Sequence, residues 1–165
     1  MKTIYFIRHS KSDQNTQCED FERPLNRRGE KDAPFMAKRL KHYKVKPDII
    51  ISSPAKRTLD TATIIAKILK YSKEKIVLKK ELYDSTHNNY LDVIKSIDNN
   101  YKNIFIVGHN PAITEVCEIL SNSIIGNIPT TGIFCIKFDV ENFQDIESQN
   151  GKVVFFDLPK KHSVK

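Results

Sequence analysis

The chain has 165 residues, of which 39% are apolar and 28% are charged, a composition typical of a globular domain. This length allows one domain that buries roughly 70% of its unfolded surface, which excludes small scaffolds held together by disulfides or metal. The formal net charge of +7, from 27 basic and 20 acidic side chains, favours anionic ligands without identifying one.

Strands and helices are predicted to alternate along most of the chain. Short runs rich in Ile, Val, Phe and Tyr indicate strands, whereas apolar residues spaced three and four apart indicate amphipathic helices. Pro34 falls near the start of the first helix, so the apolar pattern does not define where that helix begins. In chain order we predict a strand at 3–9, a helix at about 32–43, a strand at 48–53, a helix at 55–69, a strand at 75–82, a helix at about 88–97, a strand at 103–109 and a helix at 113–120.

The pattern changes after residue 126 to two β-rich runs, 132–140 and 152–158, separated by a polar stretch that ends in Asn-Gly. These runs predict an antiparallel hairpin at one end of the sheet. The expected fold is α/β: a single three-layer domain over residues 1–158, with a mainly parallel central sheet and helices on both faces. Residues 159–165 are predicted to form a flexible tail.

Polar residues at three predicted strand ends carry the chemistry. In such folds ligands bind outside the carboxyl ends of the strands. Arg8 and His9 end the first strand, Arg57 lies in the first turn of the helix that follows the second strand, and His109 ends the fourth. Asn110 and Pro111 follow it and are suited to begin a helix. Two arginines and two histidines are therefore expected to meet at one edge.

These four side chains suit phosphoryl transfer. Arginine forks match phosphate oxygens and helix N-termini supply further N–H donors, so a phosphomonoester can be neutralised without metal. A neutral imidazole can act as nucleophile, and nearby arginines disfavour its protonation. His9 is the better placed of the two. Each residue alone is commonplace, and only the joint arrangement indicates a functional site.

The chain resembles the histidine phosphatase superfamily, specifically its small phosphohistidine phosphatases of the SixA type. The resemblance extends from residue 3 to about 140 and implies the phosphoglycerate-mutase-like form of the α/β fold. It rests on five motifs in the family's order and spacing: RHSKSD at 8–13, DFERPLNRRG at 20–29, SSPAKRT at 52–58, ELYDS at 81–85 and VGHNP at 107–111.

The resemblance implies the following roles. His9 accepts the phosphoryl group, Arg8, Arg57 and His109 bind its oxygens, and water hydrolyses the phosphohistidine intermediate. Asp84 falls where many relatives place an acidic proton donor, with Glu81 as the alternative. Ser10 stands where relatives have glycine or alanine, and its hydroxyl is a candidate phosphate contact. Asn15 matches a phosphate-contacting asparagine of some relatives but fits a polar loop better.

The expected substrate is a phosphorylated protein carrying phosphohistidine, as in signal transduction. Larger relatives insert a lid before the acid, whereas the connection from residue 71 to 84 is short here, so the site is predicted to be open. Phosphohistidine also needs little help from a general acid, because its P–N bond transfers readily to another imidazole. The alternative substrate is a small phosphate monoester.

Two other classes of function stay open. A basic module that binds nucleic acid or another anion would explain the net charge, although the aromatic residues lie mainly inside predicted strands and offer no stacking platform. A metallohydrolase using His9, His109 and Asp84 lacks ligand pairs at short spacing. We therefore expect no cofactor, no metal and no nucleic acid.

The cysteine content and the length of the apolar runs indicate where in the cell the protein is located. The odd number of cysteines indicates a reducing compartment. The apolar stretch in residues 1–8 is too short for a signal core, and no later run reaches the ~20 residues of a membrane span. The expectation is a cytoplasmic protein that does not bind membranes, of undetermined oligomeric state.

Overall fold

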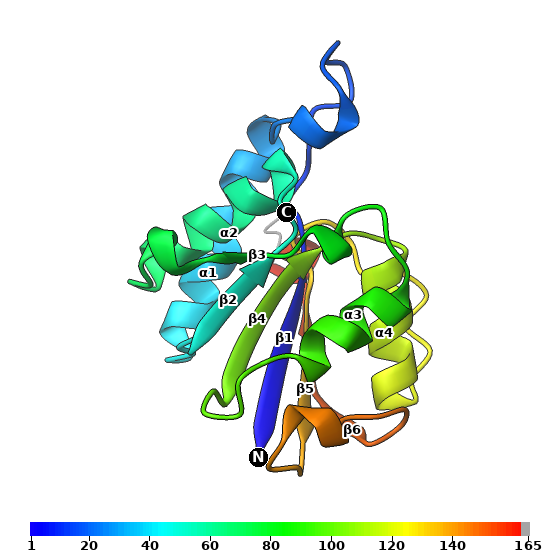
Figure 1. Ribbon diagram of the computed structural model, residues 1–165. Coiled ribbons are helices and arrows are strands. Elements are labelled where there is room, and N and C mark those ends of the chain that lie inside the picture. Colours follow the sequence, from blue (N-terminus) through cyan, green and yellow to red (C-terminus); the bar gives the residue numbers. More distant parts are fainter. Residues whose placement is uncertain (163–165) are drawn as a thin grey trace.

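One six-stranded sheet in the order β3-β2-β4-β1-β5-β6 forms the centre of the molecule (Figure 1). The structure, a computed structural model, describes residues 1–162. The first four strands pair in parallel, β5 is antiparallel to β1, and β6 is antiparallel to β5, which confirms the predicted hairpin. The strands are β1 (Lys2–Arg8), β2 (Ile49–Ser52), β3 (Val77–Leu78), β4 (Asn103–Gly108), β5 (Ile133–Phe138) and β6 (Gly151–Asp157).

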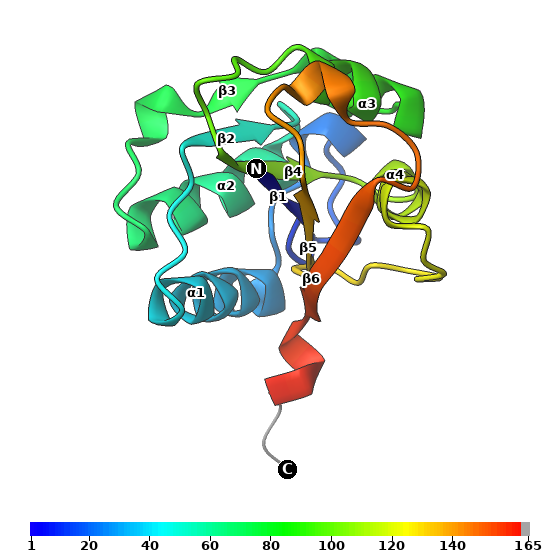
Figure 2. The ribbon, with the colours of Figure 1, turned by 90° about the horizontal axis from the view of Figure 1, so that it is seen from below.

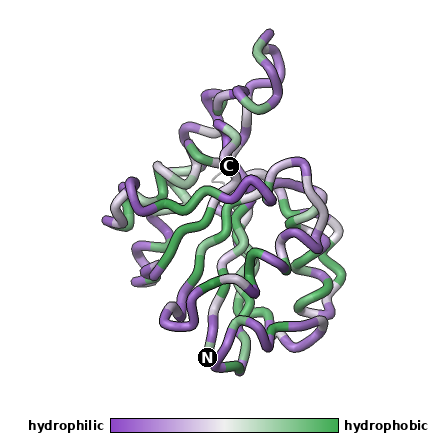
Figure 3. The backbone as a smooth tube through the Cα atoms, viewed as in Figure 1, coloured by the Kyte–Doolittle hydropathy of each residue, from purple (hydrophilic) through white to green (hydrophobic). Residues whose placement is uncertain are grey.

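Helices cover both faces of this sheet, as the alternation of buried residues along β1 requires. Ile4 and Phe6 face one core, whereas Tyr5 and Ile7 face the other. Helices α3 and α4 pack on the first core, α1 and α2 on the second (Figures 1 and 2). Hydrophobic residues run along the strands and hydrophilic residues line the outside (Figure 3). The helices are α1 (Arg27–His42), α2 (Lys56–Ile68), α3 (His87–Lys95) and α4 (Ala112–Ser121). The predicted three-layer α/β class is therefore confirmed.

Helix α1 begins five residues before the predicted start at residue 32. Asn26 ends the preceding loop, and its side chain accepts a hydrogen bond from the backbone N–H of Gly29. This satisfies one of the free donors of the first turn. Pro34 lies inside the helix and removes one backbone donor, but Ala33 and Ala37 on either side are fully buried, and this packing maintains the helix.

The strand predicted at 75–82 was wrong in extent. Only Val77 and Leu78 pair with β2, and 3₁₀ turns flank them at Lys73–Lys75 and Lys80–Leu82. Because β2 has four residues and β3 is an edge strand, few backbone partners are available to extend the ladder. Leu82 is fully buried in the core, so the chain turns inward where the sequence predicted a continuing strand.

Part of the predicted tail has a defined structure. Residues Pro159–His162 form a 3₁₀ turn, and Nε2 of His162 lies 2.6 Å from Oδ1 of Asp157. The His162 ring also packs against Phe35 of α1, with 5.8 Å between ring centroids. The rest of the predicted tail, 163–165, lies outside the described residues.

Two further findings concern membranes and cysteines. Among the described residues, no helix combines the length and hydropathy that crossing a bilayer requires. The thiols of Cys117 and Cys135 are buried, that of Cys18 is exposed, and none of the three forms a disulfide within residues 1–162.

Candidate active site

The ends of β1, β2 and β4 meet at one edge of the sheet. Arg8 pairs with Gly108, so the residues that follow, His9 and His109, are neighbours with ring centroids 5.3 Å apart. A cavity of about 190 Å³, here called the phosphate cavity, opens between them. Its lining is mostly basic or polar: Arg8, His9, Lys11, Ser12, Gln14, Arg23, Arg57, His109, Asn110 and Thr130. The structure thus brings together all four residues singled out at the strand ends.

The ring of His9 is held in one orientation. It is 7% exposed, and its Nδ1 lies 2.8 Å from the carbonyl oxygen of Ser10. A carbonyl oxygen only accepts, so Nδ1 carries the proton and Nε2 keeps a free lone pair. Burial lowers the pKa of His9 to about 3, with smaller contributions from His109, Arg57 and Arg8. Burial, more than the arginine charges considered from the sequence, therefore keeps the imidazole neutral.

His109 is fixed from two sides. Its backbone N–H donates to the hydroxyl of Tyr90, and its Nε2 lies 2.8 Å from Oγ of Ser53. That Oγ already accepts from the backbone N–H of Ala55, so we assign its proton to the bond with Nε2. This leaves the histidine proton on Nδ1, a buried atom with no partner among the described residues.

The electrostatics of His109 resemble those of His9. Burial first, and then the charge of Arg57, lowers the pKa of His109 to about 3. With its Nδ1 protonated the neutral ring is a hydrogen-bond donor, which suits an oxygen of a bound anion.

Both arginines are held by hydrogen bonds at the site, Arg57 as a buried side chain and Arg8 as a half-buried one. Arg57, in the first turn of α2, is 6% exposed, and its terminal nitrogens donate to the backbone oxygen and Oδ2 of Asp20. Arg8 donates from Nη1 to the carbonyl oxygen of Ile128, and burial together with Arg57 lowers its pKa. The Nε atoms of both arginines are buried without a partner in the described part of the chain. Buried donors of this kind require an acceptor.

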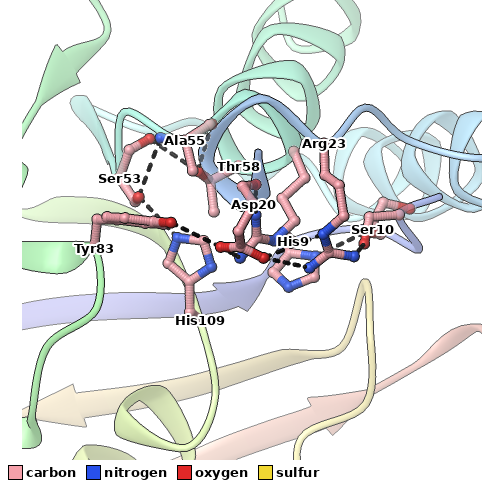
Figure 4. Close-up of polar contacts among 11 residues, drawn as sticks. His9, Ser10, Asp20, Arg23, Ser53, Ala55, Thr58, Tyr83 and His109 are labelled. Carbon is pink, nitrogen blue, oxygen red and sulfur yellow. Dashed lines mark hydrogen bonds and ion pairs between the residues drawn. The ribbon is translucent and has the colours of Figure 1, made fainter. Parts of the chain in front are cut away.

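Sequence reasoning assigned no role to Asp20, Arg23 or Tyr83, which the structure places at the site. The carboxylate of Asp20 lies 3.1 Å from Nη2 of Arg57 and 3.0 Å from Nη2 of Arg23, and it accepts a 2.7 Å hydrogen bond from Tyr83 (Figure 4). The Tyr83 bond, followed by the two arginines, lowers the pKa of Asp20 to about 2. The signal for Asp20 and Arg23 was their spacing of three residues within the motif at 20–29.

The structure places Asp84 beside the phosphate cavity, but neither Glu81 nor Ser10 lines that cavity. Asp84 is exposed and lines a second cavity next to the phosphate cavity. Glu81 is exposed and lines neither cavity. The hydroxyl of Ser10 is fully buried, where it donates to the carbonyl oxygen of Gly29 and bonds the hydroxyl of Thr131. Ser10 was expected to contact phosphate, but it does not line the phosphate cavity.

Asn15 and Asn110 were also considered from the sequence, and both lie outside the helices and strands. Asn15 lies exposed in the loop after β1, where its backbone N–H bonds Asp13, as its polar surroundings predicted. Asn110 does not cap α4, which begins after Pro111. Its side chain instead bonds Thr114, Asn127 and Ile128 and so fixes the wall of the cavity.

The donor set of the site suits an anion. Within residues 1–162 no three His, Cys, Asp or Glu side chains are grouped so as to hold a metal ion. The unpartnered Nε–H groups of Arg8 and Arg57 and the Nδ1–H of His109 are all donors. An oxyanion with several acceptor oxygens, such as a phosphoryl group, satisfies this set.

Comparisons with known proteins agree with this geometry. Residues 4–84, about half of the chain, match the family model of the histidine phosphatase superfamily (branch 1). A protein histidine phosphatase SixA solved with tungstate is 18% identical, with a TM-score of 0.84 over 98% of this chain and 99% of that one. A structure assigned to phosphohistidine phosphatase SixA from Agrobacterium tumefaciens is 24% identical, with a TM-score of 0.79 over 96% and 98%.

A third similar structure is that of a phosphatase with a different ligand. A phosphoserine phosphatase mutant from Entamoeba histolytica, solved with phosphoserine, is 20% identical, with a TM-score of 0.68 over 99% of this chain and 100% of that one. No curated protein sequence matches significantly. At these identities the structural matches establish the fold, which is that of the phosphoglycerate-mutase-like histidine phosphatases.

Proposed function

We propose that this member of the histidine phosphatase superfamily is a phosphatase that removes phosphoryl groups from phosphohistidine in proteins, with His9 as its nucleophile. The observation that carries the proposal is the hydrogen bond from Nδ1 of His9 to the carbonyl of Ser10. It directs the lone pair of Nε2 away from the backbone, in a cavity lined by Arg8, Arg57 and His109, whose side chains carry donors that match phosphate oxygens.

In the first step the Nε2 lone pair of His9 attacks phosphorus. A bond forms between Nε2 and phosphorus, and the electron pair of the breaking P–N bond moves to the leaving imidazole nitrogen. Arg8, Arg57 and His109 donate hydrogen bonds to the phosphoryl oxygens, whose charge they stabilise during the transfer. No general acid is needed when the leaving ring already has a proton on its other nitrogen.

In the second step a water molecule attacks phosphorus from the side that the leaving group has vacated. A P–O bond forms, and the electron pair of the bond to Nε2 returns to His9. One proton of the water stays on the phosphate and the other is released, so the neutral ring with its proton on Nδ1 is restored. The carbonyl of Ser10 supports this cycle, because it also stabilises the positive charge of the phosphorylated ring.

The shape of the site favours a protein substrate over an enclosed metabolite. The connection from residue 71 to 84 contains β3 and two 3₁₀ turns and adds no lid. The loop after β1, which contains Lys11, Ser12 and Gln14, forms one wall of the phosphate cavity. A much higher specificity constant for a free sugar phosphate than for a phosphohistidine protein would contradict this choice.

A small phosphate monoester is the second candidate substrate. It is supported by the likeness over the whole chain to the Entamoeba histolytica phosphoserine phosphatase structure and by Asp84, a carboxylate next to the phosphate cavity. The same nucleophile and the same arginines would serve both substrates, so the leaving group distinguishes them.

The proposal is tested by trapping the intermediate. A peptide carrying ³²P-labelled phosphohistidine is mixed with the enzyme and the reaction is quenched within milliseconds. We expect label on the protein that is lost in acid and stable in base, located on His9 by peptide mapping. His9→Ala should carry no label and lose at least about 10³-fold in kcat.

Two controls accompany this experiment. His42→Ala replaces an exposed histidine in the last turn of α1 and should change neither labelling nor kcat. Excess chelator should leave the rate unchanged, and a loss of activity would support a metallohydrolase instead. Hydrolysis that persists in His9→Ala, or label on another residue, contradicts the assignment of the nucleophile.

A further inference from the structure

A second cavity of about 300 Å³ adjoins the phosphate cavity. The two cavities share Arg57, His109 and Asn110. The remaining lining of the second cavity is acidic or phenolic: Asp20, Tyr83 and Asp84. His9 and Arg8 line only the phosphate cavity. One site therefore has a basic compartment that contains the nucleophile and an acidic compartment without it.

In-line displacement assigns a role to the second cavity. In phosphoryl transfer the leaving group departs on the side of phosphorus opposite the nucleophile. With His9 in the phosphate cavity, the leaving group extends across the shared residues into the acidic compartment. His109 is 8% exposed and lines both cavities, so it lies at the boundary between them. Its Nδ1 is a buried donor with no partner among the described residues.

Asp20 is the fixed charge of this acidic compartment. Tyr83 and Arg57 both donate to its Oδ2, and Arg23 donates to its Oδ1. The ring of Phe21 packs edge-on against Tyr83, with 5.1 Å between centroids, and so joins the 3₁₀ turn Asp20–Glu22 to the wall of the site. The side chain of Asp20 still exposes 55% of its surface, so it can contact a ligand while held in place.

We propose that Asp20 is a specificity-determining residue that selects the leaving group by charge. Its carboxylate favours a leaving group that carries a proton on nitrogen, as phosphohistidine does, and disfavours phosphate esters that carry a second anionic group. This inference deepens the proposed function and depends on it.

The chemistry of phosphohistidine explains why a carboxylate helps. When the P–N bond breaks, its electron pair moves to the ring nitrogen, and the ring leaves as neutral imidazole only if its other nitrogen is protonated. A nearby carboxylate stabilises that protonated ring by charge and by accepting its N–H. The same carboxylate repels the carboxylate of a phosphorylated hydroxy acid, so both effects act in one direction.

Asp20→Asn tests the inference, because it removes the charge and keeps the size. Two ratios of kcat/KM are measured. The first compares phosphohistidine with phosphoserine in peptides of otherwise identical sequence. The second compares 3-phosphoglycerate with glycerol 3-phosphate, which lacks the carboxylate. Asp20→Asn also frees Arg57, which lines both cavities, and the part of this change that acts on the phosphoryl group is common to every substrate and cancels in the ratios.

We expect Asp20→Asn to lower the first ratio about tenfold and to raise the second about tenfold. Asp20→Ser, which also removes the charge, should shift both ratios in the same directions. Glu22→Gln is the matched control: this exposed carboxylate lies in the same 3₁₀ turn and lines neither cavity, and its loss should change neither ratio.

Unchanged ratios in a folded, active Asp20→Asn protein would overturn this inference and leave the proposed function intact. An equal shift in Glu22→Gln would also overturn it, because the effect would then come from net charge alone. Wild-type protein that does not hydrolyse the phosphohistidine peptide would refute the proposed function itself.

Discussion

Asp84 places an exposed carboxylate in the same cavity as Asp20. The two acids differ in their surroundings. The pKa of Asp20 is lowered to about 2 by Tyr83, Arg23 and Arg57, which keeps it ionised and unsuited to donate a proton. Asp84 lines the same cavity without a place in that network of hydrogen bonds. Asp84 is therefore the better candidate for proton donation.

Asp84→Asn should separate two classes of substrate. A phosphate monoester leaves as an alkoxide that needs a proton, so its kcat/KM should fall about 10²-fold or more. Phosphohistidine leaves as an imidazole that already holds one, and we expect a loss of less than about threefold. Asparagine suits this position because residue 84 has a φ of 48°, a conformation that asparagine tolerates better than alanine. Steady-state kinetics on matched peptides provide the measurement.

Glu81→Gln is the control, since Glu81 was the other acid expected from the sequence and lines neither cavity. It should affect neither substrate. Equal losses on both substrates in Asp84→Asn would indicate a structural role for Asp84.

At the scale of single residues, the sequence predicted the groups that follow strands and missed those that reach the site from loops. Arg8, His9 and His109 were predictable because the carboxyl ends of parallel strands share one edge. Asp20 was not, because its contact with Arg57 spans 37 positions along the chain and depends on how the loop after β1 folds. Ser10 was misassigned because its neighbour His9 faces the cavity while its own hydroxyl faces α1.

The packing of α1 against the chain after β1 is an element-scale determinant of the site. Gly29 of α1 lies so close to Lys11 that a Cβ at position 29 would come within 2.1 Å of the Lys11 carbonyl oxygen. The backbone oxygen of Gly29 also accepts the hydroxyl of Ser10. Ser10 and Lys11 are the two residues that follow His9. Helix α1 therefore positions the nucleophile through its backbone, without contributing a side chain to the site.

Gly29→Ala should therefore destabilise the protein although it lies in a helix. Helix propensity alone would favour alanine by about 1 kcal/mol. The overlap with the Lys11 backbone should instead lower the free energy of unfolding by about 1 to 3 kcal/mol. Displacement of His9 should lower kcat at least about tenfold. Urea unfolding and steady-state kinetics measure the two effects.

Lys38→Ala, an exposed substitution in the same helix, should change unfolding free energy by less than about 0.5 kcal/mol and leave kcat unchanged. A gain in stability for Gly29→Ala would show that the loop after β1 yields easily, contrary to its proposed positioning role.

The elements themselves were predictable to different degrees. Periodicity identified α2 and α4 because their buried residues recur every three or four positions. It missed the first turn of α1, which depends on the cap at Asn26, and it overextended β3, whose length depends on what its neighbour β2 offers. Local patterns thus predict the type of an element better than its ends, which are decided by tertiary contacts.

Considered as a whole, the molecule holds two neutral histidines in a rim of arginines, and this arrangement links the site to stability. Burial lowers the pKa of His9 and of His109 to about 3, whereas both approach 6.5 in the unfolded chain. Above pH 6.5 neither state binds a proton at these rings. Between pH 6.5 and pH 3 the unfolded state gains up to two protons that the folded state does not, so stability falls as pH falls.

We therefore expect the free energy of unfolding to drop between pH 8 and pH 5 by about 2 kcal/mol for each of the two histidines. Urea titrations at several pH values measure this slope. The double variant His9→Asn, His109→Asn should lose most of it, whatever its absolute stability. His42→Asn, at an exposed histidine, should retain the slope of the wild type. Equal slopes in the wild type and the double variant would mean that the two rings take up protons in the folded state as readily as in the unfolded state, and burial would then not keep His9 neutral below about pH 6.5.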